Sequence, residues 1–109
     1  MLQYACELED LKTSLKLRVI LDQEAILVLY QDGQVYAIKD RCPHLGVSLE
    51  KGQYDPIGGT VTCRGHGAKI NIKTGAIEEK AHLAFFKLPT KNTTTFSTKI
   101  VNNQVFIEK

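Results

Sequence analysis

The sequence predicts an all-β fold, a small antiparallel β-sandwich made of many short strands. Two observations predict it. Short apolar runs are separated by turn residues along the whole chain, and Asp32-Gly33 between two such runs is a strong hairpin signal. The length of 109 residues is that of one domain, so we expect residues 1–109 to form a single domain with one modest core.

The first half of the chain predicts three consecutive strands. Apolar and basic residues alternate over 15–19, which is typical of a strand with one buried and one solvated face. Residues 25–30 and 34–39 are apolar runs on either side of Asp32-Gly33. Because Asp and Gly tolerate positive φ, we expect these two runs to form an antiparallel hairpin.

The second half predicts shorter elements. Four segments have strand character: 60–62, 69–72, 96–101 and 104–107. A turn is expected at 73–75, and Asn102-Asn103 favours a closing hairpin. Periodicity does not decide between a helix and an irregular connection for 76–88, where we favour a helical turn.

Composition and charge exclude several classes of function. The net charge is +2 and no run of Lys and Arg alternates with aromatic residues, so nucleic-acid binding is not expected. The longest apolar stretch, 25–30, is far too short to cross a membrane. The first residues contain no basic segment followed by an apolar core, so we expect a cytoplasmic protein without membrane association.

Charge is unevenly distributed along the chain. Residues 1–55 carry 6 basic and 9 acidic side chains, whereas residues 56–109 carry 8 basic and 3 acidic ones. This asymmetry could orient a charged partner, although most surface charge is simply solvated.

Two short motifs combine cysteine with histidine. The chain has 3 cysteines, an odd number that favours metal or redox chemistry over a disulfide framework; we expect Cys6 to be a small buried strand residue. Cys42-x-His44 and Cys63-x-x-His66 supply two thiolates and two imidazoles, and 18 residues separate the motifs. Two loops must therefore meet at one end of the sheet to enclose one metal centre. A single tetrahedral zinc could take all four ligands, so a zinc-binding interaction module remains an alternative.

The two motifs resemble the cluster-binding loops of the Rieske family. The matching segments read Cys42-Pro-His-Leu-Gly46 and Cys63-Arg-Gly-His-Gly67, and the flanking residues 35–38, 49–52, 61–62 and 68–75 are also similar to Rieske ferredoxins. The resemblance implies a Rieske-like sandwich with a cluster-binding subdomain formed by two loops. It also implies one [2Fe–2S] cluster per chain, with Cys42 and Cys63 on one iron and His44 and His66 on the other.

Departures from the family pattern indicate the type of cluster. Val47 and Gly65 stand where high-potential members have a pair of disulfide-forming cysteines, and Ala68 stands where those members have a hydrogen-bonding serine. We therefore expect a potential near the low end of the Rieske range of about −150 to +300 mV. Ile70 and Asn71 replace the Phe and Asp of many relatives, which puts the fine packing in doubt.

The resemblance implies an electron carrier rather than an enzyme. Such a ferredoxin would pass electrons from a flavin-dependent reductase to an oxygenase, and we expect it to be monomeric in isolation. A Rieske-like small subunit of an assimilatory nitrite reductase is the alternative of closest class. Arg41, Arg64 and Lys69 flank the ligand loops as solvated charges or as a docking surface for an acidic partner.

Four phenylalanines and one further histidine complete the candidates. We expect His82 to be a surface or half-buried residue without a metal role. The phenylalanines are expected in the core: Phe85, Phe86, Phe96 and Phe106.

Overall fold

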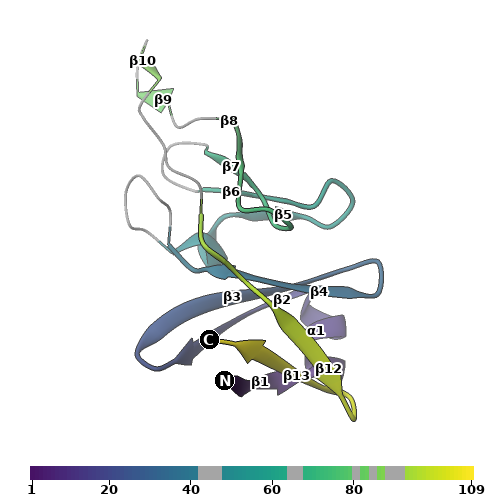
Figure 1. Cartoon of the computed structure of the whole chain (residues 1–109). Helices are drawn as coiled ribbons and strands as arrows, with labels where there is room; N and C mark the ends of the chain where they lie inside the picture. Colours follow the sequence, from purple (N-terminus) through teal and green to yellow (C-terminus); the bar gives the residue numbers. More distant parts are fainter. Residues whose placement is uncertain (42–47, 64–67, 80–81, 84–85, 88–92) are drawn as a thin grey trace.

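Three β-sheets of three or four strands lie one above another in the computed structural model, and a further sheet has two strands (Figure 1). The structure describes residues 1–41, 48–63, 68–79, 82–83, 86–87 and 93–109. The sheets are antiparallel throughout these residues, and two buried apolar clusters fill the spaces between them. The all-β prediction is confirmed.

The middle sheet is built on the predicted hairpin. Its strand order is β11-β4-β3-β2. The strands are β2 (Lys16–Leu21), β3 (Glu24–Gln31), β4 (Gln34–Lys39) and β11 (Thr95–Phe96). Asp32 and Gly33 have φ values of 48° and 78° between β3 and β4, so the turn is the one that their residue types predict.

The lower sheet joins the two ends of the chain. Its order is β1-β13-β12, made of β1 (Leu2–Glu7), β12 (Thr98–Val101) and β13 (Gln104–Glu108). Asn102 and Asn103 turn the predicted β12–β13 hairpin with φ values of 52° and 62°. Phe96 does not belong to this hairpin, because it pairs with Ala37 of the middle sheet.

One helix follows β1, in a segment for which we predicted no element. Helix α1 (Leu8–Ser14) buries Leu8 and Leu11 and ends at Leu15, whose left-handed φ is 71°. The spacing of three between the two leucines and the acidic Glu9 and Asp10 in the first turn are helix signals. No helix in the described ranges has the length and apolar character to cross a membrane.

The upper sheet carries the segment that we expected to be helical. Its order is β5-β6-β7-β8. It contains β5 (Gln53–Asp55), β6 (Thr60–Thr62), β7 (Lys69–Asn71) and β8 (Ile77–Glu79), and the 3₁₀ helix η1 (Leu49–Lys51) precedes it. The helical turn predicted for 76–88 is wrong for the residues of this segment that the structure describes: β8 pairs with β7, and β9 (His82–Leu83) pairs with β10 (Phe86–Lys87). Strand pairing at the sheet edge outweighs the weak local preference.

Strand β3 explains how the layers are held together. Its apolar run is buried on both faces, because successive side chains point to opposite sides of the sheet. Leu27 and Leu29 pack in the cluster between the middle and upper sheets, called here the upper cluster. Ile26 and Val28 pack with Cys6 in the cluster between the middle and lower sheets, the lower cluster. Cys6 is thus the buried strand residue that the sequence predicted.

Candidate metal centre

Cys63 is buried at the end of the strand that leads into the second motif. It follows β6 directly, is 1% exposed, and donates its backbone N–H to the Ala68 carbonyl over 2.7 Å. Thr62 and Lys69 form the adjacent β6–β7 pair. The hairpin base therefore closes at Cys63 and Ala68, which fixes both ends of the segment 64–67.

Asp40 fixes the base of the first motif. Its carboxylate accepts hydrogen bonds from the Glu50 N–H at 2.8 Å and from the Ser48 hydroxyl. Arg18 Nε on β2 donates to the same carboxylate over 2.8 Å. The two ends of the segment 42–47 are therefore joined to each other and to the middle sheet.

The bases of the two motifs meet in one buried cluster. Leu49, the first residue of η1, packs in the upper cluster together with Cys63 and Ala68. Gly52 lies so close to β6 that a Cβ built on it would stand 2.0 Å from the Thr62 carbonyl oxygen. The residues that follow the first motif are thus in direct contact with the strand that leads into the second.

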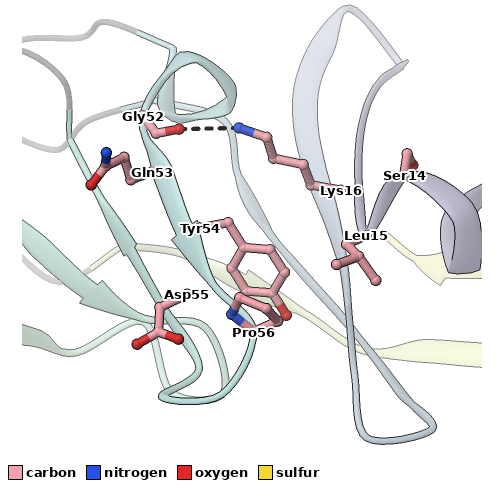
Figure 2. Close-up of a pocket in the computed structure, with 8 residues that line it drawn as sticks. All are labelled: Ser14, Leu15, Lys16, Gly52, Gln53, Tyr54, Asp55 and Pro56. Atoms are coloured by element: carbon pink, nitrogen blue, oxygen red, sulfur yellow. Dashed lines mark hydrogen bonds between the residues drawn. The ribbon is translucent and has the colours of Figure 1, made fainter.

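A lysine from the middle sheet holds η1 in this position. Lys16 Nζ donates to the Gly52 carbonyl over 3.0 Å, as Figure 2 shows, and also to the Glu50 carbonyl. Lys16 and Gly52 line an open groove between the end of α1 and β5, beside the Tyr54 ring. The Lys16 ammonium group is therefore bound by backbone carbonyls that lie just after the first motif.

A third chain segment returns to the same region. Thr93 N–H donates to the Gly75 carbonyl over 2.8 Å, and Lys39 N–H donates to the Thr94 carbonyl over 2.9 Å. The residues that follow 88–92 are thereby fixed against both the upper sheet and the end of β4.

The structure describes one of the four predicted ligands. Cys63 is described, whereas Cys42, His44 and His66 lie outside, as do Val47, Arg64 and Gly65. In the described ranges, no three His, Cys, Asp or Glu side chains gather as a metal site. What the structure brings together is the pair of loop bases, through Leu49, Cys63 and Ala68.

Other predicted residues have definite positions. Arg41 is exposed just before the first motif, and Lys69 is half-buried on β7 just after the second. His82 lies in β9. Phe96 and Phe106 are half-buried: Phe96 packs against the lower cluster, and Phe106 makes an edge-on contact with Tyr4. The predictions for Phe85 and Phe86 concern side chains that lie outside the described part of the structure.

Cys6 differs from Cys63 in its surroundings and in its chemistry. Burial, together with the charges of Asp10 and Glu7, raises the pKa of the Cys6 thiol to about 11. The thiol is therefore protonated at neutral pH and is a poor metal ligand. Cys6 also packs in the lower cluster, on the far side of the middle sheet from Cys63.

The surroundings of Cys63 fit an iron–sulfur cluster. A buried thiol at a loop base, packed against apolar side chains and backbone, suits a soft metal ligand from which water is excluded. Ala68 is fully buried at the same base and has no side-chain hydrogen-bond donor.

The model of the Rieske [2Fe–2S] domain matches residues 1–90, a range that contains both Cys–His motifs. The chain belongs to the Rieske family. A [2Fe–2S] cluster is therefore its cofactor, as the sequence predicted.

This chain spans very different shares of two relatives. Human apoptosis-inducing factor 3 is 35% identical over 74 residues, which are 68% of this chain but only 12% of that protein. The ferredoxin subunit of 3-phenylpropionate/cinnamic acid dioxygenase from Escherichia coli K12 is 30% identical over 106 residues, covering 96% of this chain and 91% of that subunit.

The Rieske fold is also shared with a solved structure. The ferredoxin of carbazole 1,9a-dioxygenase from Nocardioides aromaticivorans IC177 superposes with a TM-score of 0.82 over 98% of this chain and 96% of its own. At 18% identity this likeness concerns the fold. It confirms the Rieske-like β-sandwich.

Asp40 is a buried residue beside the first motif that the sequence did not single out. Its partners Arg18, Ser48 and Glu50 lie up to 22 residues away in sequence, so no local pattern joins them. The available signal was an acidic residue just after an apolar strand, two positions before the first cysteine of a metal motif.

Proposed function

We propose that this chain is a one-electron carrier whose [2Fe–2S] cluster is held by Cys42 and Cys63 on one iron and by His44 and His66 on the other. When bound, such a cluster accepts and releases single electrons. The observation that carries the proposal is the buried contact of Leu49 with Cys63 and Ala68, because it joins the bases of the two motifs.

Each described residue near the motifs has a distinct role in this proposal. The Cys63 thiolate binds iron, and Leu49, Val61 and Ile70 exclude water around its side of the site. Ala68 offers no hydroxyl, which supports a potential near the low end of the Rieske range. The buried carboxylate of Asp40 and the ammonium of Lys16 hold the chain on either side of the first motif.

The partners proposed are a flavin-dependent reductase and an oxygenase. The support is the dioxygenase ferredoxin subunit that matches nearly end to end. Exposed Arg41 and half-buried Lys69 lie next to the two motifs, and Arg64 lies within the second. These basic groups favour an acidic docking surface on the partner, so electron transfer should slow with increasing salt.

The organisation of the chain is part of the same proposal. We expect residues 1–109 to be one domain, monomeric in isolation and cytoplasmic. The middle sheet supports one domain because it contributes to both apolar clusters. A single cooperative unfolding transition, a monomer mass in solution and recovery in the cytosolic fraction are the expected results.

Electron relay tests the proposal. The purified protein is mixed with NADH, a flavoprotein reductase of an aromatic-ring dioxygenase system, and cytochrome c as a one-electron acceptor. We expect cytochrome c reduction that depends on the chain, is abolished in Cys63→Ser and is retained in Cys6→Ala, the matched change at a second buried cysteine of the described residues. An active Cys63→Ser variant would refute the ligand assignment.

A different outcome would favour the nitrite reductase alternative. Stable co-purification with a large siroheme or flavin subunit, without relay to cytochrome c, would identify the chain as a subunit of such a complex.

A further inference from the structure

Asp40 is an unusual residue for the end of a buried strand. Its side chain is 0% exposed, although it is a carboxylate, and a buried charge is costly unless it is fully paired. Three donors from different parts of the chain surround it: the Arg18 guanidinium, the Ser48 hydroxyl and the Glu50 N–H.

The chemistry of a carboxylate suits this junction. Two oxygens can accept all three hydrogen bonds, with Arg18 and Ser48 on Oδ2 and Glu50 on Oδ1. An asparagine would present an amide N–H₂ in place of one oxygen and would oppose a donor with a donor. An apolar residue would leave the Glu50 N–H and the Ser48 hydroxyl without their acceptor.

The position of the junction is equally specific. Asp40 precedes the segment 42–47, whereas Ser48 and Glu50 follow it, so the carboxylate joins the residues before this segment to the residues after it. Arg18 ties the closed base to β2, and Leu49, between the two donors, packs in the cluster with Cys63. One side chain thus couples the first motif to the base of the second.

We propose that Asp40 is a positioning residue that fixes the first ligand segment in register with Cys63 before the cluster is inserted. The inference rests on the proposed ligands Cys42 and His44. Fixing the loop ends in the cluster-free protein lowers the entropy lost when these two side chains bind iron. Rapid release of the cluster is therefore the expected defect when the junction is broken.

Amide exchange in the cluster-free protein and cluster release in the loaded protein test the inference separately. The variants are Asp40→Asn, Arg18→Gln, Ser48→Ala and Ser48→Thr. Asp55→Asn is the control, because the Asp55 carboxylate also accepts backbone hydrogen bonds, from the Ile57 and Gly58 N–H groups, but in the β5–β6 turn. The Arg18 side chain is 44% exposed, so we expect Arg18→Gln to fold. This variant still tests the junction if Asp40→Asn does not fold.

In cluster-free Asp40→Asn, we expect exchange of the Glu50 amide to accelerate about tenfold or more, with exchange in β3 unchanged. In loaded protein, we expect chelator-driven loss of visible absorbance to accelerate about tenfold to a hundredfold, as for other residues that orient metal ligands. Ser48→Ala should show a smaller effect that Ser48→Thr restores, and Asp55→Asn should match the wild type in both measurements.

The midpoint potential distinguishes positioning from simple electrostatics. Asp40→Asn removes a negative charge and Arg18→Gln removes a positive one, so an electrostatic role would shift the potential in opposite directions. Opposite shifts with unchanged release rates would overturn the inference, as would a wild-type exchange rate at Glu50 in Asp40→Asn. The amide measurement needs no cluster, so it tests Asp40 even if the ligand proposal fails.

Discussion

Gly52→Ala tests the contact that brings the two motifs together. The new Cβ would stand 2.0 Å from the Thr62 carbonyl oxygen and 3.1 Å from its carbon. Ordinary contacts begin near 3.4 Å, so η1 and β6 must separate by about 1.4 Å, and both contacts are with backbone that no rotamer change can relieve. The φ of Gly52 is −84°, so the conformation itself is open to alanine.

The magnitude follows from two opposing terms. Overpacking against a fixed backbone costs about 3 kcal/mol, and the reduced entropy of the unfolded chain offsets up to about 1 kcal/mol. We therefore expect a net loss of about 2 kcal/mol in the free energy of unfolding. Because Thr62 directly precedes Cys63, we also expect the cluster to be lost faster.

Guanidinium unfolding followed by far-ultraviolet circular dichroism measures the stability, and chelator-driven loss of visible absorbance measures cluster retention. Gly33→Ala is the control: its φ of 78° is strained for alanine, but nothing lies within 4 Å of the added Cβ. It should lose about 1 kcal/mol and keep the wild-type cluster-loss rate. A Gly52→Ala protein within about 0.5 kcal/mol of wild type, with an unchanged cluster, would refute the reasoning.

Three further changes test other parts of the structure. Leu49→Ala, at a fully buried position, should lower the free energy of unfolding by about 2–5 kcal/mol and speed loss of the [2Fe–2S] cluster. A variant that unfolds like wild type would show that Leu49 does not stabilise the apolar packing around Cys63. Cys6 has a folded pKa of about 11, above its ordinary value of 9.0, so its contribution to stability is complete below pH 9 and is lost as the pH rises towards 11. Cys6→Ala should flatten the stability profile in that window without altering the visible spectrum, and an unchanged slope would count against the raised pKa. Ala68→Ser should raise the midpoint potential by adding a donor at the fully buried loop base, as the comparison with high-potential Rieske members implies; protein-film voltammetry showing no rise, or a wild-type midpoint well above zero, would contradict the low-potential assignment.

Local chemistry made the hairpins predictable. Asp32-Gly33 and Asn102-Asn103 adopt positive φ because these residue types tolerate it, and the strands beside them follow directly. The buried run of β3 was also recognised as a strand. Its burial on both faces required the lower sheet, whose strands come from the two ends of the chain.

Long-range contacts limited the other predictions. The 76–88 segment lacks a clear period, and its β8 part is fixed by pairing of Ile77 with Ile70 of β7. The Asp40 junction and the contacts of Lys16 with η1 join residues that are distant in sequence. Two departures from the family pattern fit without disruption: Ile70 is fully buried, and Asn71 Oδ1 accepts the backbone N–H groups of Lys73 and Thr74 at the next turn.

The visible absorption spectrum of the purified protein, read together with its metal content, tests the central claim most directly. A Rieske cluster predicts a red-brown protein with visible bands, two irons per chain, and loss of the bands in Cys63→Ser but not in Cys6→Ala. A colourless protein that contains one stoichiometric zinc, or full-strength bands in Cys63→Ser, would contradict the account.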